Sequence, residues 1–568
     1  MRKKISRFFA VITLLWSSVC TICWSAFPQD LPGQVRELIR NRIEYAGIPF
    51  KIIIGKEVIY STMVLPVFYE RRGYDPAWGG NYGPFSFVDS LLKEIKEASC
   101  EGLSAEDYHL DEIQKILLKI RRTQQRQHKP NPYDLADLDL LLTDAFLIYG
   151  SHLLAGKVNP ENIDAEWIAY RREADLAQVL KRAVETGQIE KALKSLLPSQ
   201  PEYKRLRDAL AHYRLIESKG GWKSVPEGPP MKPGDRGARV VTLCERLSAT
   251  DDLPSMKTDI PDVYNDEVEQ AVRRFQERHG LEINGVVDSM TLVELNIPVN
   301  ERIRKIELNM ERWRWLPQDL GQRHILINIA NFELDVVENE QIILTMLAVV
   351  GNQFRRTPVF SDMMTYLVFN PYWNVSSNMA VQDILPQVLK DPHYLESQNM
   401  KVLQGWGADV NEIDPKTIDW PSIDRNNFPF RFRQEPGPMN ALGRVKFMFP
   451  NKFNVYLHDT PSKGYFLKNK RAFSSGCIRI EKPIELAEYL LRPDPQWTKE
   501  KILATIKSGN ETTVKLPVAI PIHLLYWTAW ADSDGVIHFL EDIYGRDKLV
   551  HEALREKYTD SSGVSGEK

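Results

Sequence analysis

The chain has 568 residues, which is too many for one hydrophobic core and predicts two to four domains. Hydrophobic residues make up 43% of it and charged residues 26%, an ordinary globular composition that excludes a disordered or fibrous chain. The formal net charge is −3, so there is no basic excess and no nucleic-acid partner is expected.

The N-terminus has the pattern of a secretory signal peptide, which we place at residues 1–26. Basic residues between positions 2 and 7 precede an uncharged stretch from Phe8 to Trp24, and small residues follow it. This stretch is at the lower length limit for a spanning helix, so an uncleaved membrane anchor stays open as the alternative. We therefore expect an exported protein whose membrane contact is confined to this segment.

Beyond the signal segment the sequence holds Cys100, Cys244 and Cys477, an odd number that indicates at least one free thiol. Cys100 and Cys244 lie in helix-like stretches and are expected to be small buried hydrophobic residues, although a disulfide between them stays open. A free thiol in an oxidising compartment risks oxidative damage, so its presence indicates a chemical use. That argument directs attention to Cys477.

Residues 27–225 are predicted to form a helical scaffold domain, because apolar residues recur at helical spacing in several stretches, such as 88–100, 138–150 and 177–197. A turn-rich linker of Pro and Gly residues follows at 226–237. The next module, residues 229–298, is predicted to be a small three-helix domain, with helices at Val240–Leu247, Asp266–His279 and Met290–Leu295.

Residues 299–550 change character and predict a mostly β domain. The strand-like runs lie at 324–329, 334–337, 342–350, 366–369, 446–449, 454–458, 520–530 and 536–540. A helical pattern at 376–403 and a long irregular stretch at 404–440 interrupt them, and we expect a helical lid at about 375–435. A further helix is expected at Pro483–Leu491 and a tail at 551–568. The predicted fold class is therefore a multidomain α+β protein.

Candidate chemistry gathers at His458 and at the stretch from Ser474 to Arg479. A thiol attacks acyl groups only as a thiolate, so Cys477 needs a base or positive surroundings. His458 is a candidate base, and Gly476 permits the unusual backbone conformation that exposes a nucleophile beside backbone N–H donors. Arg479 would lie on the same side as Cys477 in an extended segment. The residues alone leave open a second interpretation, in which Cys477 and His458 are ordinary core residues.

The stretch His458…Ser474-Ser475-Gly476-Cys477-Ile478-Arg479 resembles the signature of YkuD-type L,D-transpeptidases. Ser475 stands where many members have a second histidine, but the large YcbB-like subfamily with an N-terminal scaffold domain also carries Ser-Ser-Gly-Cys. The resemblance extends to segments at 102–109, 370–375, 440–447 and 526–530. Residues 231–297 resemble the three-helix peptidoglycan-binding domain, with Asp288 in place of a common glycine.

This resemblance implies an activity, a compartment and partners. Cys477 would form a thioester with the tetrapeptide stem of peptidoglycan, His458 would be the base, and a second stem would accept the acyl group to give a 3→3 cross-link. Carbapenems would react with the same cysteine. Donor and acceptor stems are the expected partners, cell-wall synthesis proteins are candidate partners, and the compartment would be the periplasm.

The resemblance also assigns supporting residues. It implies that Gly476 shapes the nucleophile loop and that the substrate groove includes Arg479, Ser474, Ser475, Tyr456 and Trp373. No cofactor is expected, and the histidine and cysteine spacings indicate no metal site. Two alternatives stay open: a hydrolase in which water resolves the thioester, as an L,D-carboxypeptidase or endopeptidase, and a non-catalytic cell-wall-binding protein.

Overall fold

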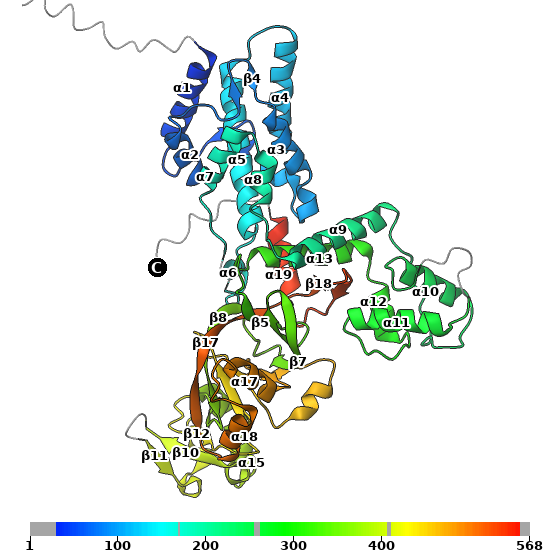
Figure 1. The fold of residues 1–568 in the computed structure, drawn as a ribbon, viewed down its shortest axis with the longest axis vertical. Helices are drawn as coiled ribbons and strands as arrows, with labels where there is room; N and C mark the ends of the chain where they lie inside the picture. Colours follow the sequence, from blue (N-terminus) through cyan, green and yellow to red (C-terminus); the bar gives the residue numbers. More distant parts are fainter. Residues whose placement is uncertain (1–29, 169–170, 255–261, 406–409, 557–568) are drawn as a thin grey trace, which may run out of the picture. The chain divides into compact units, whose positions relative to one another are not determined.

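The computed structural model describes residues 30–168, 171–254, 262–405 and 410–556. The expected signal peptide at 1–26 lies outside them, as does the tail beyond residue 556. The first five residues of the expected tail belong instead to helix α19 (Arg546–Arg555). The chain divides into two compact units (Figure 1). Of the described residues, the first unit contains those up to Lys157 and 173–197, and the second contains 158–172 and 198–556.

The first unit is a helical bundle, as the sequence predicts for the scaffold. Its centre is α5 (Pro132–Ala155), which begins at the cap Asn131, whose side chain accepts the Tyr133 N–H at 2.9 Å. By length and composition α5 could cross a membrane, but 89% of its most apolar window is buried inside the unit. It is therefore a core helix. Around it lie α1 (Leu31–Glu44), α2 (Val64–Arg71), α3 (Phe87–Lys96), α4 (Leu110–Gln125), α7 (Leu176–Thr186) and α8 (Ile189–Lys194).

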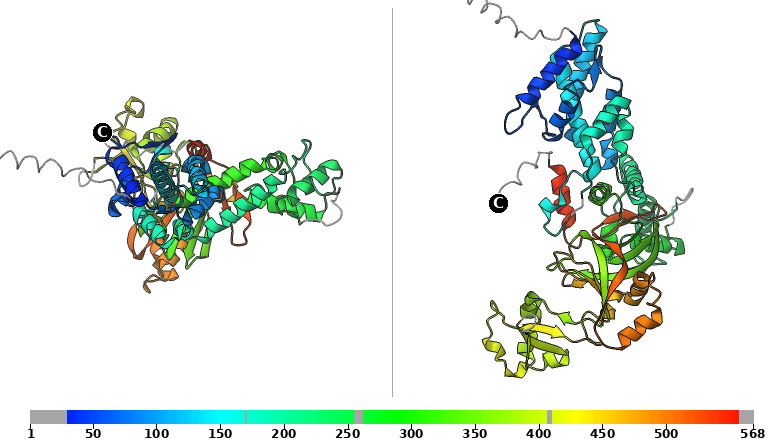
Figure 2. Two further views of the ribbon diagram at one scale, coloured as in Figure 1. Left: turned by 90° about the horizontal axis from the view of Figure 1, so that it is seen from above. Right: turned by 60° about the vertical axis from the view of Figure 1, so that its left-hand side comes forward.

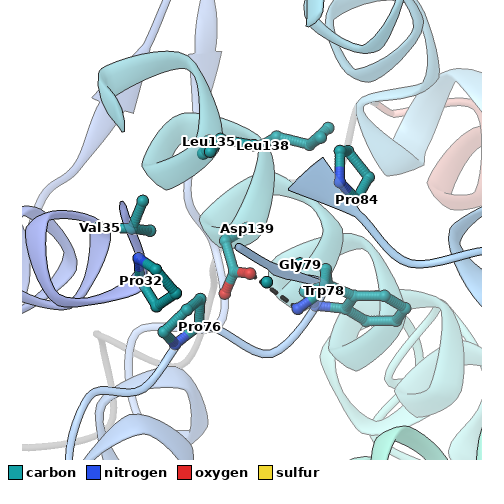
Figure 3. A pocket seen from close by; sticks show the side chains of 10 residues that line it. Pro32, Val35, Pro76, Trp78, Gly79, Pro84, Leu135, Leu138 and Asp139 are labelled. Atoms are coloured by element: carbon teal, nitrogen blue, oxygen red, sulfur yellow. Dashed lines mark hydrogen bonds between the residues drawn. The ribbon is translucent and has the colours of Figure 1, made fainter. Parts of the chain in front are cut away.

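A pocket in this unit lies between α1, α5 and the short hairpin β3 (Gly79–Gly80) and β4 (Gly83–Pro84), as Figure 3 shows. Its one acidic lining group is Asp139. The Asp139 carboxylate accepts hydrogen bonds from the Ala77 and Trp78 N–H groups at 2.9 and 2.8 Å and from the Tyr69 hydroxyl at 2.7 Å. These donors hold the loop before the hairpin against α5. The oxygens of this carboxylate already accept hydrogen bonds within the unit, so they have little capacity left to bind a ligand.

His109, also in the first unit, is buried between two carboxylates. Its Nδ1 lies 2.8 Å from Glu57 Oε2 and its Nε2 lies 2.8 Å from Asp144 Oδ2. Burial lowers the pKa of His109, but the two carboxylates outweigh burial and raise the pKa above its ordinary value of 6.5. The stabilisation by protonated His109 is therefore complete below about 6.5 and is lost as the pH rises through the raised folded-state pKa.

We expect the free energy of unfolding of the first unit to fall as the pH rises from about 6 to 9. His109→Gln should lower this free energy by about 2–4 kcal/mol at pH 6 and should flatten its pH dependence, because a charged partner is removed from a buried network. The measurement is urea-dependent hydrogen exchange of α5 peptides at both pH values. An unchanged pH dependence in the variant would contradict the prediction.

Residues 231–297 form the predicted three-helix module, with α10 (Ala238–Ser248), α11 (Asp266–Arg278) and α12 (Ser289–Leu295). Asn265 and Asp288 cap α11 and α12 by accepting backbone N–H groups. Cys244 lies in the core of this module, where burial raises the pKa of its thiol to about 11. Cys100 is exposed, so the expectation of a buried side chain was wrong for it. Neither forms a disulfide in the described chain.

The rest of the second unit centres on a β-barrel. Within the described residues the strands run in the order β15-β7-β16-β14-β13-β8-β17-β5-β6, and β6 pairs back onto β7 to close the circuit. Their bounds are β5 (Arg323–Asn328), β6 (Glu333–Glu338), β7 (Gln341–Gly351), β8 (Phe360–Phe369), β13 (Val445–Met448), β14 (Leu457–His458), β15 (Ala472–Ser474), β16 (Ile478–Ile480) and β17 (Thr512–Leu525).

Alternating residues of these strands fill one continuous core. Val445, Leu457, Ile478 and Ile480 all belong to it. Helices α17 (Pro483–Leu491) and α18 (Lys499–Lys507) lie between β16 and β17 in the chain and are drawn in orange in Figure 2. α9 (Pro201–Ser218), expected in the scaffold, instead packs on α13 (Val299–Arg314) in the second unit. A closing hairpin of β18 (Ala529–Ala531) and β19 (Ile537–Phe539) matches the predicted last strands, although β17 begins well before the predicted 520.

The lid differs from the helical lid that the sequence predicts. Its described residues form a sheet of the order β11-β10-β12-β9 beside short helices, with its own apolar core. The strands are β9 (Trp373–Asn374), β10 (Met400–Gln404), β11 (Asn411–Ile413) and β12 (Arg431–Gln434), and the helical segments are α14 (Ser377–Met379), a π-helix η3 (Ala380–Ile384), α15 (Leu385–Lys390) and α16 (Tyr394–Ser397). Two of these strands occupy the stretch expected to be irregular.

Candidate active site

The loop from Ser475 to Cys477 joins β15 to β16 and is held by the side-chain hydroxyls of Ser474 and Thr357. Gly476 has a φ of +110°, a conformation that side chains disfavour. The Gly476 N–H donates to Ser474 Oγ at 3.2 Å, and the Ser474 hydroxyl donates to the Cys477 carbonyl at 2.5 Å. The Gly476 carbonyl accepts from Thr357 Oγ1 at 2.8 Å. Both polar groups of Gly476 are therefore engaged in shaping the loop.

Strand register places the predicted catalytic residues on one face of the barrel. β14 and β16 run parallel, with Leu457 opposite Ile478 and His458 opposite Arg479. Because Leu457 and Ile478 enter the core, the alternating neighbours project from the opposite face. Tyr456, His458, Cys477 and Arg479 thus share that face. The structure brings together residues that the sequence separates by about twenty positions.

His458 is buried, and its ring is fixed by one hydrogen bond. Its Nδ1 lies 2.6 Å from the Asp459 carbonyl oxygen, which can only accept, so Nδ1 carries the proton and Nε2 carries the lone pair. Burial, followed by the positive charge of Arg479, lowers the pKa of His458 to about 3. The imidazole is therefore neutral at neutral pH, the state in which it can accept a proton.

The Cys477 thiol is half-buried, with Sγ 3.9 Å from the Asn454 carbonyl oxygen. Burial raises the pKa of Cys477, while hydrogen bonding from Tyr456 and the positive charges of Lys446 and Arg479 oppose that rise. In the described chain no hydrogen bond joins Sγ to the His458 ring. The resting pair is therefore a neutral thiol beside a neutral imidazole, and not a thiolate–imidazolium ion pair.

This resting state predicts the pH dependence of Cys477 alkylation. Iodoacetamide reacts with the thiolate, so its rate should keep rising past pH 9, the ordinary pKa of a thiol. Arg479→Met should move the inflection to still higher pH, because one opposing positive charge is lost. Stopped-flow alkylation followed by intact mass measures both. A rate that reaches its plateau below pH 7 would show an ion pair instead.

Backbone N–H groups near the thiol could stabilise an oxyanion. In the described chain the N–H groups of Ser475 and Cys477 donate to no other residue. The Gly476 N–H is occupied by Ser474 Oγ. The available donors therefore flank Gly476 and do not include it.

The remaining predicted residues have mixed surroundings. Arg479 lies over the Tyr465 ring at 5.5 Å, and its Nε has no hydrogen-bond partner in the described chain. Ser474 is buried and acts as a loop staple, which leaves it little access to substrate. Trp373 packs against the apolar core of the lid.

Ser475 connects the nucleophile loop to the lid. Its Oγ lies 3.0 Å from Arg355 Nη1, and Arg355 pairs with the Asp383 carboxylate at 2.5 and 3.0 Å. Arg355 also donates to Gln382 at 2.8 Å. Gln382 and Asp383 lie in η3, and π-helical turns often occur at functional sites. Arg355 therefore bridges the lid and Ser475, which lies two residues before Cys477.

Sequence reasoning missed three residues of this site, namely Lys446, Arg355 and Asp459. Asp459 follows the base and accepts the Arg444 N–H at 2.9 Å and the Lys463 ammonium at 2.7 Å. Its position beside His458 was the available signal. Lys446 lies in the 440–447 segment that resembles the family, but only strand pairing sets it beside His458. Arg355 gave no signal, because a contact across 120 residues brings it to the site.

Models of known protein families match three parts of this chain. Residues 322–516 match the family model of the YkuD L,D-transpeptidase catalytic domain, residues 64–210 match a scaffold domain model, and residues 236–295 match a peptidoglycan-binding domain model. A curated protein of Haemophilus influenzae, to which L,D-transpeptidase activity is attributed, is 37% identical over 248 residues. That match covers 44% of this chain and 49% of the relative, so the chain spans about half of the relative's length.

Two solved structures of L,D-transpeptidases also match. The one from Xylanimonas cellulosilytica is 15% identical and covers 53% of this chain and 98% of its own, with a TM-score of 0.17. The one from Stackebrandtia nassauensis is 12% identical and covers 53% and 96%, with a TM-score of 0.21. At such TM-scores neither likeness bears on the assignment, which rests on the three domain models. Residues 322–516 are thus a catalytic domain of the YkuD L,D-transpeptidase family, in a chain that also carries a scaffold domain and a peptidoglycan-binding domain.

Proposed function

We propose that this protein is a peptidoglycan L,D-transpeptidase that forms 3→3 cross-links through a thioester on Cys477. The observation that carries the proposal is the β14–β16 register, which places Cys477 and His458 on one face of the barrel. The second support is the Nδ1 hydrogen bond to the Asp459 carbonyl, which leaves Nε2 of His458 free to accept a proton. Both supports concern the chemistry of acyl transfer and are independent of the family comparison.

In the first half-reaction the donor is a tetrapeptide stem with meso-diaminopimelate at its third position. His458 Nε2 takes the thiol proton as Sγ attacks the carbonyl carbon of that residue. The N–H groups of Ser475 and Cys477 are the candidate donors to the tetrahedral oxyanion. The intermediate then collapses with cleavage of the C–N bond, and His458 returns the proton to the departing D-alanine amine.

In the second half-reaction the side-chain amine of another stem attacks the thioester carbonyl. His458 removes a proton from that amine, the C–S bond breaks and the thiol is restored. If water took the place of the amine, the same residues would make a carboxypeptidase or endopeptidase. Lys446 and Arg479, both positively charged, flank His458 and favour the negative charge that develops in each step.

The other domains support action on the cell wall. We propose that the 231–297 module binds peptidoglycan chains and that the enzyme works outside the cytoplasm, in the periplasm, after export. Donor and acceptor stems would then be its partners, with cell-wall synthesis proteins as candidate neighbours. Carbapenems would acylate Cys477 by the same attack on a carbonyl carbon.

The test is intact-mass spectrometry of the mature protein incubated with purified disaccharide-tetrapeptide, beside Cys477→Ala. We expect an acyl adduct on the wild type alone, one donor residue short of its D-alanine, together with 3→3 dimers in the supernatant. An adduct accompanied only by trimmed tripeptide would replace the transpeptidase by a hydrolase. Neither adduct nor turnover would favour a wall-binding role.

A further inference from the structure

Lys446 lies in the row of side chains that crosses the active-site face. On β13 it pairs with His458, and His458 pairs in turn with Arg479. Its neighbours Val445 and Phe447 enter the barrel core, so Lys446 projects from the same face as the nucleophile. Adjacent strands are about 4.8 Å apart, which places a lysine side chain within reach of groups bound at the thiol. Its Nζ lies 3.9 Å from the centroid of the Tyr456 ring.

The Lys446 ammonium has no counter-ion in the described chain. It forms neither a hydrogen bond nor an ion pair there, and its side chain is half-buried. Two acidic groups act on its charge, the Cys477 thiol when it is ionised and, after it, Glu511. The Glu511 carboxylate lies beyond 4 Å and accepts the Tyr372 N–H at 3.0 Å. Other lysines of this unit do have partners: Lys463 contacts Asp459 at 2.7 Å and Lys499 contacts Glu488 at 3.0 Å.

Partial burial of an ammonium group beside a ring face costs desolvation free energy, and here no ion pair offsets that cost. Burial lowers the pKa of Lys446, which is the physical sign of this cost. An anionic ligand at the site would remove the imbalance. Arg479, the other unpaired positive charge, lies on the far side of His458 and faces Tyr465, so the two side chains address different parts of a bound peptide.

We propose that Lys446 is a specificity-determining residue that binds the free carboxylate of the residue released from the donor peptide. This inference rests on the proposed function, in which that residue is the C-terminal D-alanine. The carboxylate is attached to the Cα that follows the scissile nitrogen, so it lies within a few bonds of the carbon that Sγ attacks. His458 must protonate the same nitrogen, and Lys446 is its neighbour across the strand pair. The enzyme would thereby select donors that end at the released residue.

The experiment compares two donors, the tetrapeptide stem with a free C-terminal carboxylate and the same stem as its C-terminal carboxamide. Rates of thioester formation on Cys477 are measured by quenched-flow intact mass. We expect the wild type to prefer the acid by about tenfold or more, because a charge-assisted contact is lost in the amide. Lys446→Met should reduce this preference to about one, and Lys446→Arg should keep most of it. Lys499→Met, a lysine already paired with a carboxylate, is the matched control and should behave as the wild type.

The acid-to-amide ratio separates recognition from effects on folding or on the thiol. Equal losses for both donors in Lys446→Met would overturn the proposal, since Lys446 would then act on Cys477 or on the fold. Loss of the preference in Arg479→Met instead would assign recognition to the other positive charge and would likewise overturn it.

A second measurement keeps the inference testable if the wild type acylates with neither donor, an outcome that would count against the proposed function itself. Both peptides are then titrated against Cys477→Ala and against Cys477→Ala with Lys446→Met. Tighter binding of the acid to the first protein alone would support Lys446 as the carboxylate site. Equal affinities, or no binding of either peptide, would refute it.

Discussion

His458→Gln is expected to slow thioester formation by about 10²–10⁴-fold at pH 7, the usual contribution of a positioned general base. The side chain of glutamine can donate to the Asp459 carbonyl as Nδ1 does, but its amide oxygen is too weak a base to take the thiol proton. The geometry of the loop should survive, because the buried position of His458 accepts a side chain of similar length. The defect should therefore be in the chemical step and not in folding.

The pH dependence makes this prediction sharper. With a pKa of about 3, His458 is neutral throughout the working range, so wild-type acylation should be nearly constant between about pH 5 and 9. In His458→Gln only spontaneous thiolate reacts, and the rate should climb about tenfold per pH unit below the raised pKa of Cys477. The defect should thus shrink markedly by pH 10.

The control is His538→Gln. His538 stacks on Trp530 and its Nε2 lies 3.0 Å from Asp532, in the β18–β19 hairpin of the same unit. Its replacement should leave acylation unchanged. A His458→Gln protein with a pH-independent defect, or with wild-type rates at pH 7, would show that another group removes the proton.

Much of the fold can be predicted from the sequence, because long strands and capped helices have recognisable local sequence patterns. The run predicted at 342–350 is β7 within one residue at each end, and the helix predicted at Pro483–Leu491 is α17. The lid sheet was missed because its strands have two to five residues, too few to show an alternating pattern. The division of the scaffold was missed because the packing of α9 on α13 is a tertiary contact.

The candidate site is legible only in part. The signature gives Cys477 and His458, but their common face follows from a parallel pairing that no local pattern encodes. The sequence grouped Ser474 and Ser475 together as substrate contacts, whereas the structure makes one a loop staple and the other a partner of Arg355. In the sequence Lys446 is an ordinary outward-facing lysine of an alternating strand. Only the pairing of β13, β14 and β16 shows that it lies beside the candidate catalytic residues.

Gly351→Ala is expected to slow thioester formation by about 10²-fold or more, although Gly351 touches no reacting atom. A Cβ there would lie 2.2 Å from the Arg355 carbonyl oxygen and 2.7 Å from the Thr357 nitrogen. Both obstacles are backbone atoms that cannot rotate away, so the end of β7 or the 352–357 loop must shift. That loop carries Thr357, whose hydroxyl accepts the Gly351 N–H at 2.9 Å and donates to the Gly476 carbonyl at 2.8 Å.

A displaced Thr357 would release Gly476, and misplacement of a nucleophile by about 1 Å costs on the order of 10²-fold in rate. The steric clash should also lower the free energy of unfolding by about 1–3 kcal/mol, the usual cost of overpacking. Quenched-flow acylation and thermal unfolding measure the two effects. Gly464→Ala is the matched control, because its Cβ would meet no atom within 4 Å and both effects should be absent.

Thr357→Val tests the hydrogen bonds of the Thr357 hydroxyl without displacing the 352–357 loop, because valine keeps the side-chain shape and lacks the hydroxyl. We expect it to slow acylation by about tenfold while leaving β7 in place, because the Gly476 carbonyl and the Gly351 N–H each lose a buried partner. If Thr357→Val and a folded Gly351→Ala both acylate within about threefold of the wild type, the loop around Gly476 does not need this brace. The positive φ of Gly476 and the Ser474 hydrogen bonds would then be sufficient to hold Cys477 in position.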